Sequence, residues 1–333
     1  QLAKRGTRFS QAFVTAPVCS TCRSAFITGM YQTSIGAHHH RSGRGEQKIE
    51  LQPGIKPIPE LFKEAGYYTS ITGWPIRQGR LGKTDYNFEW DKAMYDGADW
   101  SGRKAGQPFF AQIQLPGGKL RGGTQEATEK FAQRIEQTFG NRTKVSDVKL
   151  PPYYPRDPVI LHDWAAYLDS VRETDRVVGE IIKRLREDEV LENTVVIFMT
   201  DHGISHARGK QFLYDEGLHV PLVIAGPKVD GGKTRDDLVE HIDIAATSLA
   251  LAGIPIPESV EGTSLMSVLE NPETPVRDEL YFAYTDLHRG VKDRRYKLIE
   301  YVLNGRRTET QLFDLQEDPL ELCNLADDPT QAE

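Results

Sequence analysis

The sequence contains little cysteine: 3 residues in 333 allow one disulfide at most, which excludes a cystine framework as the source of stability. It also lacks long apolar runs, since stretches such as Val195–Met199 fall far short of the ~20 residues that cross a bilayer. A basic excess is absent too, because 41 Lys and Arg stand against 48 Asp and Glu, a net charge of −7, which argues against a nucleic-acid partner. With 38% hydrophobic and 27% charged residues, the composition is that of a globular protein rather than a disordered or membrane-spanning one.

Helix and strand patterns alternate along most of the chain. Amphipathic helices are predicted over Ile58–Ala65, Ile160–Glu187 and Ile242–Ala252. Strands rich in β-branched and aromatic residues are predicted over Gly66–Thr72, Pro108–Leu115, Val195–Met199 and Leu222–Ala225. This alternation predicts an α/β fold in which a large mixed sheet is sandwiched by helices.

The pattern changes near residue 270. Short segments of period two follow at Leu280–Tyr284, Arg295–Tyr301 and Gln311–Asp314, and they predict a smaller antiparallel sheet. We therefore predict a main α/β domain over residues 1–270 and a small C-terminal subdomain over residues 271–333. Within the main domain, Gly117–Ser146 is rich in glycine and charge, which predicts an insertion or a long loop beside the active site.

Cys19 and Cys22 form a Cys-x-x-Cys motif, which invites a redox or zinc interpretation. Zinc needs further soft ligands, and Cys323 is the other thiol of the sequence, so an inert pair is an equally open alternative. The run that follows predicts a short helix beginning just after Cys19. A cysteine at a helix N-terminus lies among backbone N–H groups that favour anions, and Arg23 returns to the same face one turn later. Cys19 and Arg23 thus predict one anion site.

The motif Cys-x-(Pro/Ala/Thr)-x-Arg, followed by a short apolar helix ending in Thr-Gly, resembles the signature of the type I sulfatases of the alkaline phosphatase superfamily. In that family the cysteine is oxidised after synthesis to formylglycine, whose aldehyde hydrate is the nucleophile. The resemblance implies that Cys19 carries this modification, because Cys22 has Phe26 rather than Arg four places later. Thr21 stands where the commonest pattern has Pro, which leaves open whether a formylglycine-generating enzyme or an anaerobic maturation enzyme acts here.

Asp201 and His202 directly follow the predicted strand Val195–Met199, at the edge where open α/β sheets bind ligands. An Asp-His-Gly sequence alone is a weak signal, since turn aspartates are common after strands. Together with the cysteine motif, the pair resembles the sulfatase motif that binds calcium or, less often, magnesium. The resemblance implies a hard divalent cation that polarises the sulfate and the formylglycine hydrate.

Further cationic residues resemble sulfate-binding elements of the same family. Lys210 lies in a Gly-Lys…Tyr-x-x-Gly segment whose lysine contacts a sulfate oxygen, and Lys83 lies in an element similar to Gly-Lys-x-His, with Asp85 in place of the histidine. His206 is near enough in sequence to act as general acid or base on the leaving oxygen, although an exposed loop is the alternative. Lys119 stands where many members carry the second histidine of His-x-x-His, so the leaving-group acid stays open.

Three consecutive histidines, His38, His39 and His40, precede Arg41. A metal-binding tract is one interpretation. Consecutive side chains do not converge on one ion in a regular element, however, and a solvated loop is the plain alternative. We predict that His39, His40 and Arg41 form a rim that recognises an anionic sugar.

The first residues, Gln1–Phe9, predict the last turn of a helix, a stop at Gly6 and an entering strand. Sulfatases carry two adjacent aspartates at the end of their first strand, which complete the metal site, and that strand would precede this sequence. Asp236 and Asp237 cannot substitute for them, because we predict that they lie in a loop. We expect a portion of a longer chain rather than a metal-deficient relative, and the resemblance implies a periplasmic or secreted protein.

The resemblance spans the chain from Cys19 to Leu325 and implies a sulfuric-ester hydrolase that acts on a sulfated saccharide in polysaccharide degradation. Its partners would be that substrate and the maturation enzyme. A sulfamidase and a phosphate or phosphonate monoester hydrolase of the same fold are alternatives, and so is a non-catalytic carbohydrate-binding relative. A redox protein using Cys19 and Cys22 is the least supported, since nothing else resembles a thioredoxin-type context.

Overall fold

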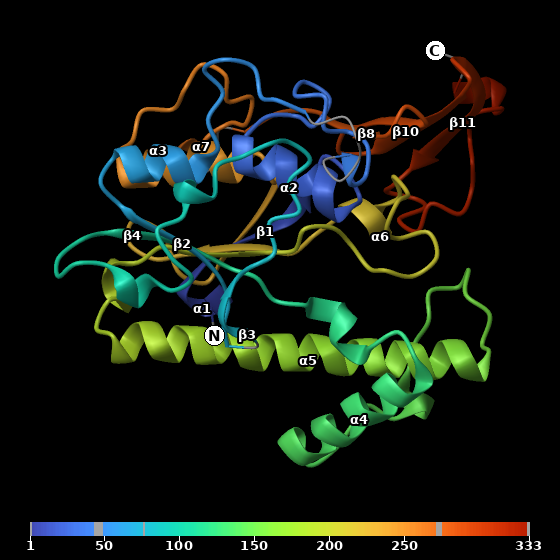
Figure 1. Cartoon of the computed structure of the whole chain (residues 1–333). Helices are drawn as coiled ribbons and strands as arrows, with labels where there is room; N and C mark the ends of the chain where they lie inside the picture. The colour runs from blue at the N-terminus through green and yellow to red at the C-terminus, as the bar shows by residue number, and fades with distance from the viewer. Residues whose placement is uncertain (1, 43–48, 76, 271–274, 332–333) are drawn as a thin grey trace. The chain divides into compact units, whose positions relative to one another are not determined.

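The computed structural model describes residues 2–42, 49–75, 77–270 and 275–331 (Figure 1). It consists of two compact units. Unit 1 comprises Gln1–Ile113 and Val195–Glu333, and unit 2 comprises Gln114–Thr194.

Strand β1 (Gly6–Phe13) is an inner strand of a four-stranded mixed sheet in unit 1, with the order β5-β6-β1-β7. Strand β6 (Leu222–Ala225) is antiparallel to both β1 and β5 (Val196–Met199), so β1 and β5 run in the same direction. Strand β7 (Lys233–Glu240) is parallel to β1. The carboxyl ends of β1, β5 and β7 therefore share one edge of the sheet, which is where open α/β sheets bind ligands.

The predicted helix turn and entering strand at the start of the chain are confirmed, but the role of Gly6 is not. Helix α1 (Leu2–Arg5) is followed at once by the strand, so Gly6 is the first strand residue and not a helix stop. A Cβ at Gly6 would approach the Ile224 carbonyl oxygen to 2.1 Å. The glycine is therefore needed for close strand pairing rather than for ending a helix.

The prediction that Asp236 and Asp237 lie in a loop is wrong, because both belong to β7. The first half of this strand is mostly exposed and charged, whereas its last four residues are buried. Asp237 accepts a hydrogen bond from Nε of Arg235 at 2.8 Å. The sequence did not predict this strand, because its first half lacks the alternating or continuous apolar residues typical of strands.

The remaining main strands form a second sheet of three strands in the order β3-β2-β4, made of β2 (Tyr68–Gly73), β3 (Arg77–Leu81) and β4 (Phe109–Ile113). Helices α2 (Cys19–Thr28), α3 (Ile58–Glu64) and α7 (Asp243–Ala252) pack against one another on the same side of these strands (Figure 1). Apolar residues of β1, β6, β7 and α7 form a buried cluster, with Phe26 of α2 packed against it. The predicted mixed α/β architecture is confirmed, although hydrogen bonding divides its strands between two sheets.

The predicted smaller antiparallel sheet is also confirmed. It has the order β11-β10-β9-β8, made of β8 (Leu280–Tyr284), β9 (His288–Lys292), β10 (Tyr296–Leu303) and β11 (Arg306–Asp314). Phe13 and Val14, at the end of β1, share one buried cluster with Phe282, Ile299 and Phe313 of this sheet. Short helices α6 (Asp215–Leu218) and α8 (Met266–Glu270) complete unit 1. The domain boundary near residue 270 stays a prediction.

Unit 2 contains helices α4 (Gln125–Phe139) and α5 (Pro158–Glu187), and the second agrees with the long predicted helix. The prediction of a loop over Gly117–Ser146 is wrong where α4 forms. Thr124 caps its N-terminus by accepting a hydrogen bond from Ala127 N, Gly140 ends it in the left-handed conformation, and Phe131 and Ile135 bury one face. Among the described residues, no helix combines the length and apolar character needed to span a bilayer.

Candidate active site

Helix α2 places Cys19 at its N-terminus, just beyond the end of β1. Val18 precedes the helix in an extended conformation, and no described side chain caps it, so the first-turn N–H groups suit an anion. Gly29 ends the helix with φ of 69°, and a Cβ there would meet the Cβ of Ala245 at 2.6 Å. Both the conformation and the contact require glycine at this position.

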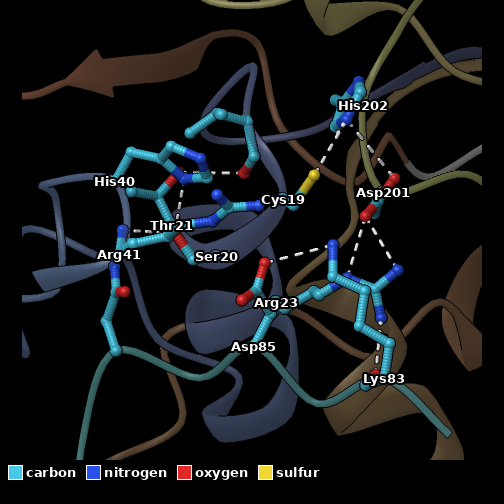
Figure 2. A network of polar contacts seen from close by, with 12 residues as sticks. Cys19, Ser20, Thr21, Arg23, His40, Arg41, Lys83, Asp85, Asp201 and His202 are labelled. Carbon is cyan, nitrogen blue, oxygen red and sulfur yellow. Dashed lines mark hydrogen bonds and ion pairs between the residues drawn. The ribbon is translucent and has the colours of Figure 1, made fainter. Parts of the chain in front are cut away.

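Cys19 is buried, and its Sγ lies 3.2 Å from Nε2 of His202. Nδ1 of His202 lies 2.8 Å from the Gly203 carbonyl, which fixes the ring with Nε2 toward the sulfur (Figure 2). Burial opposes ionisation, but the hydrogen bond with His202 and the charge of Lys83 lower the pKa of Cys19 to about 6. Burial instead raises the pKa of Cys22 well above its usual value. The two thiols of α2 therefore differ in acidity, and Cys19 is the more readily ionised.

Arg23 lies beside Cys19, as its spacing predicts. Its Nε and one terminal nitrogen each lie 2.8 Å from Oδ2 of Asp201, and its other terminal nitrogen donates to the Lys83 carbonyl at 3.1 Å (Figure 2). Two segments distant in sequence, those of Asp201 and Lys83, therefore hold this guanidinium in place.

Cys19, Asp201 and His202 present one possible ligand atom each, all within 4.8 Å of one another. The sulfur stands at the position that an oxygen of formylglycine would occupy. A carboxylate oxygen and that oxygen suit a hard divalent cation, to which imidazole adds a nitrogen ligand. The predicted metal-binding pair fits such an ion.

Lys83 forms an ion pair with Asp85, with 3.1 Å between Nζ and Oδ2, and the Asp85 side chain is only 2% exposed (Figure 2). The aspartate that replaces the family's histidine thus orients the neighbouring lysine. Lys210 lies on the loop after β5, where its backbone N–H donates to the Ile204 carbonyl. The charge of Lys210 is one of those that lower the pKa of His40.

His40 and Arg41 adjoin the nucleophile helix through Ser20. Nδ1 of His40 lies 2.8 Å from Ser20 Oγ, which also accepts a hydrogen bond from the Arg41 backbone N–H at 2.9 Å (Figure 2). Burial, followed by the charges of Arg41 and Lys210, lowers the pKa of His40 to about 4. His40 is therefore neutral at pH 7 and suits hydrogen bonding better than acid catalysis.

His38 and His39 face a different partner. Their Nε2 atoms lie 3.3 and 3.1 Å from the two carboxylate oxygens of Asp286, in the turn between β8 and β9. The expectation that consecutive histidines do not converge concerned regular elements; this segment is an irregular bend, so His38 and His39 can both approach Asp286.

Two further predicted residues lie on other segments of the chain. His206 is partly buried on the loop between β5 and α6, and Lys119 lies on a single turn of 3-10 helix in unit 2. Their roles as leaving-group acid and substrate contact stay predictions.

Sequence reasoning missed His241, which directly follows β7 and is buried beneath α2. Its Nδ1 accepts a hydrogen bond from the Thr15 N–H at 3.2 Å, and its Nε2 lies 2.9 Å from the Cys22 carbonyl. Burial lowers its pKa to about 4, which keeps the ring neutral for both bonds. A prediction of strand β7 would have pointed to His241, because β7 is parallel to β1 and ends at the same edge of the sheet, directly before this histidine.

A pocket of about 360 Å³ opens beside the network. Its lining includes Arg41, Lys83, Asp85, Asn87 and Trp90. It shares Lys83 and Asp85 with the polar contacts near Cys19, and Trp90 adds an aromatic face.

Comparison with known proteins agrees with this geometry. The Sulfatase family model matches residues 1–254, and a model described as N-sulphoglucosamine sulphohydrolase, C-terminal, matches residues 202–333. An ulvan-active sulfatase of Formosa agariphila is 28% identical over 408 residues, covering 99% of this chain and 67% of that protein. Arylsulfatase K of Homo sapiens is 33% identical over 405 residues, covering 97% of this chain and 72% of its own.

The fold also matches a solved structure of a protein in complex with its substrate D-glucosamine-2-N,6-O-disulfate. The TM-score is 0.73 at 18% identity, and the match covers 99% of this chain and 88% of the other.

Proposed function

The chain belongs to the sulfatase family of sulfuric-ester hydrolases, and on that premise we propose that it removes sulfate from a sulfated saccharide with a formylglycine generated from Cys19. The observation that carries the proposal is the meeting of Cys19, Arg23, Lys83, Asp201 and His202 at the N-terminus of α2. The ulvan-active relative, and the structural neighbour with a sulfated glucosamine, support a saccharide substrate.

The residues around Cys19 suit the stabilisation of a sulfuryl group in transfer. Arg23 and Lys83 would bind sulfate oxygens together with the first N–H groups of α2, and Lys210 would add a third cation. Asp201 holds the Arg23 guanidinium in place before substrate arrives, so this charge needs little reorganisation.

The proton transfers also have candidate groups. Nε2 of His202 faces the reacting position, but it is the nitrogen that would bind the metal ion, so we do not assign it the role of proton acceptor. His206, or Lys119 as the alternative, would donate the proton that the departing sugar oxygen needs when its bond to sulfur breaks. The low pKa of His40 argues against His40 in that role.

The family also uses a divalent metal ion, which we propose to be calcium, with magnesium as the alternative. Asp201 and His202 would hold it, and when bound it would withdraw charge from the sulfate oxygens. A formylglycine at position 19 would supply a hydrated aldehyde oxygen as the nucleophile toward sulfur. We propose that one of the two sulfatase maturation systems installs it.

The pocket lined by Arg41, Lys83, Asp85 and Trp90 is the proposed saccharide subsite. Trp90 offers an aromatic face to a sugar ring, and Arg41 attracts anionic groups. His40 joins this rim through Ser20. His39 pairs with Asp286, so a contact between His39 and the sugar would have to replace that pair.

Replacement of the nucleophile precursor tests the proposal. We expect Cys19→Ala, made in the complete chain, to lower kcat by at least about a thousandfold on a sulfated saccharide while the melting temperature changes little. The matched control is Cys22→Ala, which removes the other buried thiol of α2 and should keep turnover within a few-fold. Peptide mass spectrometry should find the mass loss of formylglycine formation at position 19 and not at position 22. Ordinary turnover by Cys19→Ala would refute the proposal.

A sulfamidase is the second candidate, because the C-terminal N-sulphoglucosamine sulphohydrolase model covers residues 202–333. Parallel assays of matched O-sulfated and N-sulfated glucosamine, with a phosphate monoester as a third substrate, distinguish the reactions. Preference for the N-sulfate would replace ester hydrolysis by sulfamate hydrolysis at the same site. An unmodified Cys19 thiol with no turnover of any of the three would favour a carbohydrate-binding protein instead.

A further inference from the structure

The histidine tract and the β8–β9 turn form a second group of possible metal ligands. It consists of His38, His39 and Asp286 and shares no residue with the group at Asp201 and His202. His38 and His39 approach Asp286 through Nε2, and their rings lie 4.6 Å apart between centroids. The three ligand atoms all lie within 4.8 Å of one another.

We propose that His38, His39 and Asp286 bind a divalent transition-metal ion such as Zn²⁺ on the rim of the active site. Two imidazole nitrogens and one carboxylate oxygen are ligands that zinc, nickel and copper prefer, whereas calcium and magnesium prefer oxygen alone. The rim site would thus select a different metal from the one expected at Asp201.

The spacing agrees with this chemistry. Neighbouring ligands on a tetrahedral zinc ion, with bonds of about 2.0–2.1 Å, lie about 3.3 Å apart. The two nitrogen-to-oxygen distances, 3.3 Å to His38 and 3.1 Å to His39, are close to this value. A small closing movement of His38 toward His39 completes three corners, and water can take the fourth because the Asp286 side chain is 72% exposed.

The backbone on both sides of the site is already held in place. Nδ2 of Asn87 donates to the carbonyls of Ala37 and His39, at 2.9 and 2.6 Å, and so brackets His38. The Thr285 N–H donates to the His38 carbonyl at 3.0 Å, which ties the tract to the residue before Asp286.

The β8–β9 turn is fixed as well. The Arg289 guanidinium donates to the carbonyls of Thr285 and His288, at 2.6 and 2.7 Å. A metal would therefore order three side chains rather than two loops, and this lowers the entropic cost of binding.

Metal binding to the tag-free full chain tests the site. The background is Cys19→Ala, which removes the thiol ligand of the other cluster, and excess Ca²⁺ is present throughout. Titration calorimetry with Zn²⁺ should detect one bound equivalent, and Co²⁺ should give the visible absorption of a tetrahedral complex. His39→Ala and Asp286→Asn should each weaken Zn²⁺ binding by about tenfold or more.

The matched control is His162→Ala, which removes an exposed histidine from unit 2 and should leave the titration unchanged. Both test residues have exposed side chains, so circular dichroism should report an intact fold. Absence of Zn²⁺ binding, or binding that neither His39→Ala nor Asp286→Asn weakens, overturns the proposal and leaves a simple ion pair. Neither result bears on formylglycine at position 19, so the sulfatase proposal is tested separately.

Discussion

Two clusters of charge in unit 1 are arranged in opposite ways. In one, Lys297 of β10 is completely buried, and its Nζ donates to Asp215 and, at 2.7 Å, to Glu321 Oε1. Burial lowers the pKa of Lys297, but Asp215 and Glu321 raise it above its usual value overall. The cation is matched by anions of the protein itself, so this cluster joins α6 and the small sheet to the C-terminal segment.

In the other cluster, Lys83 is 40% exposed and lies at a pocket that it shares with Arg41. Its neighbour Arg23 is held by Asp201 at the N-terminus of α2, where the helix itself favours anions. These cations are also paired, with Asp85 and Asp201, but Lys83 lies at a pocket that a substrate can enter. The comparison teaches that buried charge matched within the fold stabilises it, whereas charge placed at an opening serves a ligand.

The largest expected effect concerns the closed cluster. Lys297→Met should lower the free energy of unfolding by about 3–5 kcal/mol, because the buried Glu321 and the partly buried Asp215 are left without their cation. Urea unfolding measures this loss, and kcat/KM of the folded protein should stay within twofold of wild type. The double variant Lys297→Met/Glu321→Gln should recover part of the loss. Equal stability of wild type and the single variant would remove the basis of the comparison.

The open cluster should respond in the reverse way. Lys83→Met should lower kcat/KM on a sulfated saccharide by about 10²- to 10³-fold, since it removes a cation from the developing sulfate charge. Its free energy of unfolding should fall by about 1–2 kcal/mol, less than for Lys297→Met, because Lys83 is 40% exposed although its partner Asp85 is buried. Lys92→Met, at an exposed site of the same segment, is the control and should change neither quantity. A stability loss as large as that of Lys297→Met would mean that Lys83 is structural.

A smaller effect on stability, which depends on pH, comes from the buried carboxyl group of Glu240. Glu240 accepts a hydrogen bond from Tyr31, but its Oε1 has no partner among the described residues. Burial raises its pKa from 4.5 to about 8, against the charge of Arg277. The folded protein therefore holds this proton more tightly than the unfolded chain, so its contribution is full below pH 4.5 and is lost as the pH rises to about 8.

Urea unfolding at pH 5, 7 and 8.5 tests this dependence. Glu240→Gln should flatten the profile by at most about 4 kcal/mol and should be more stable than wild type at pH 8.5. The exposed Glu258→Gln should keep the wild-type profile. An unchanged slope in Glu240→Gln would show that Glu240 is ionised in the folded protein at neutral pH.

The sequence could predict those parts of the site that depend on local structure. Arg23 returns to Cys19 because a helix repeats within four residues, and Asp201 reaches the sheet edge because it follows an apolar strand. The contact between His202 and Cys19 followed only from the family resemblance, since 183 positions separate the two residues.

Other features depend on pairings that no local pattern encodes. Strand β7 is charged along its outer half and is stabilised by β1, so its own composition does not predict it. The convergence of His38 and His39 on Asp286 depends on an irregular bend and on a distant turn. The resemblance to sulfatases did not imply this convergence, because Asp286 lies outside the motifs that carry the resemblance.

Asn87 connects three parts of the site: helix α2, the histidine tract and the loop that lines the pocket. Its backbone N–H donates to Ser24 of α2, its side chain brackets the histidine tract, and it lines the pocket itself. The nucleophile helix, the rim and the pocket loop are therefore coupled as one rigid body, and their amides should exchange with solvent together in a single cooperative opening. The residues that recognise the substrate would then keep fixed positions. Access of a bulky glycan would be controlled by movement of other segments.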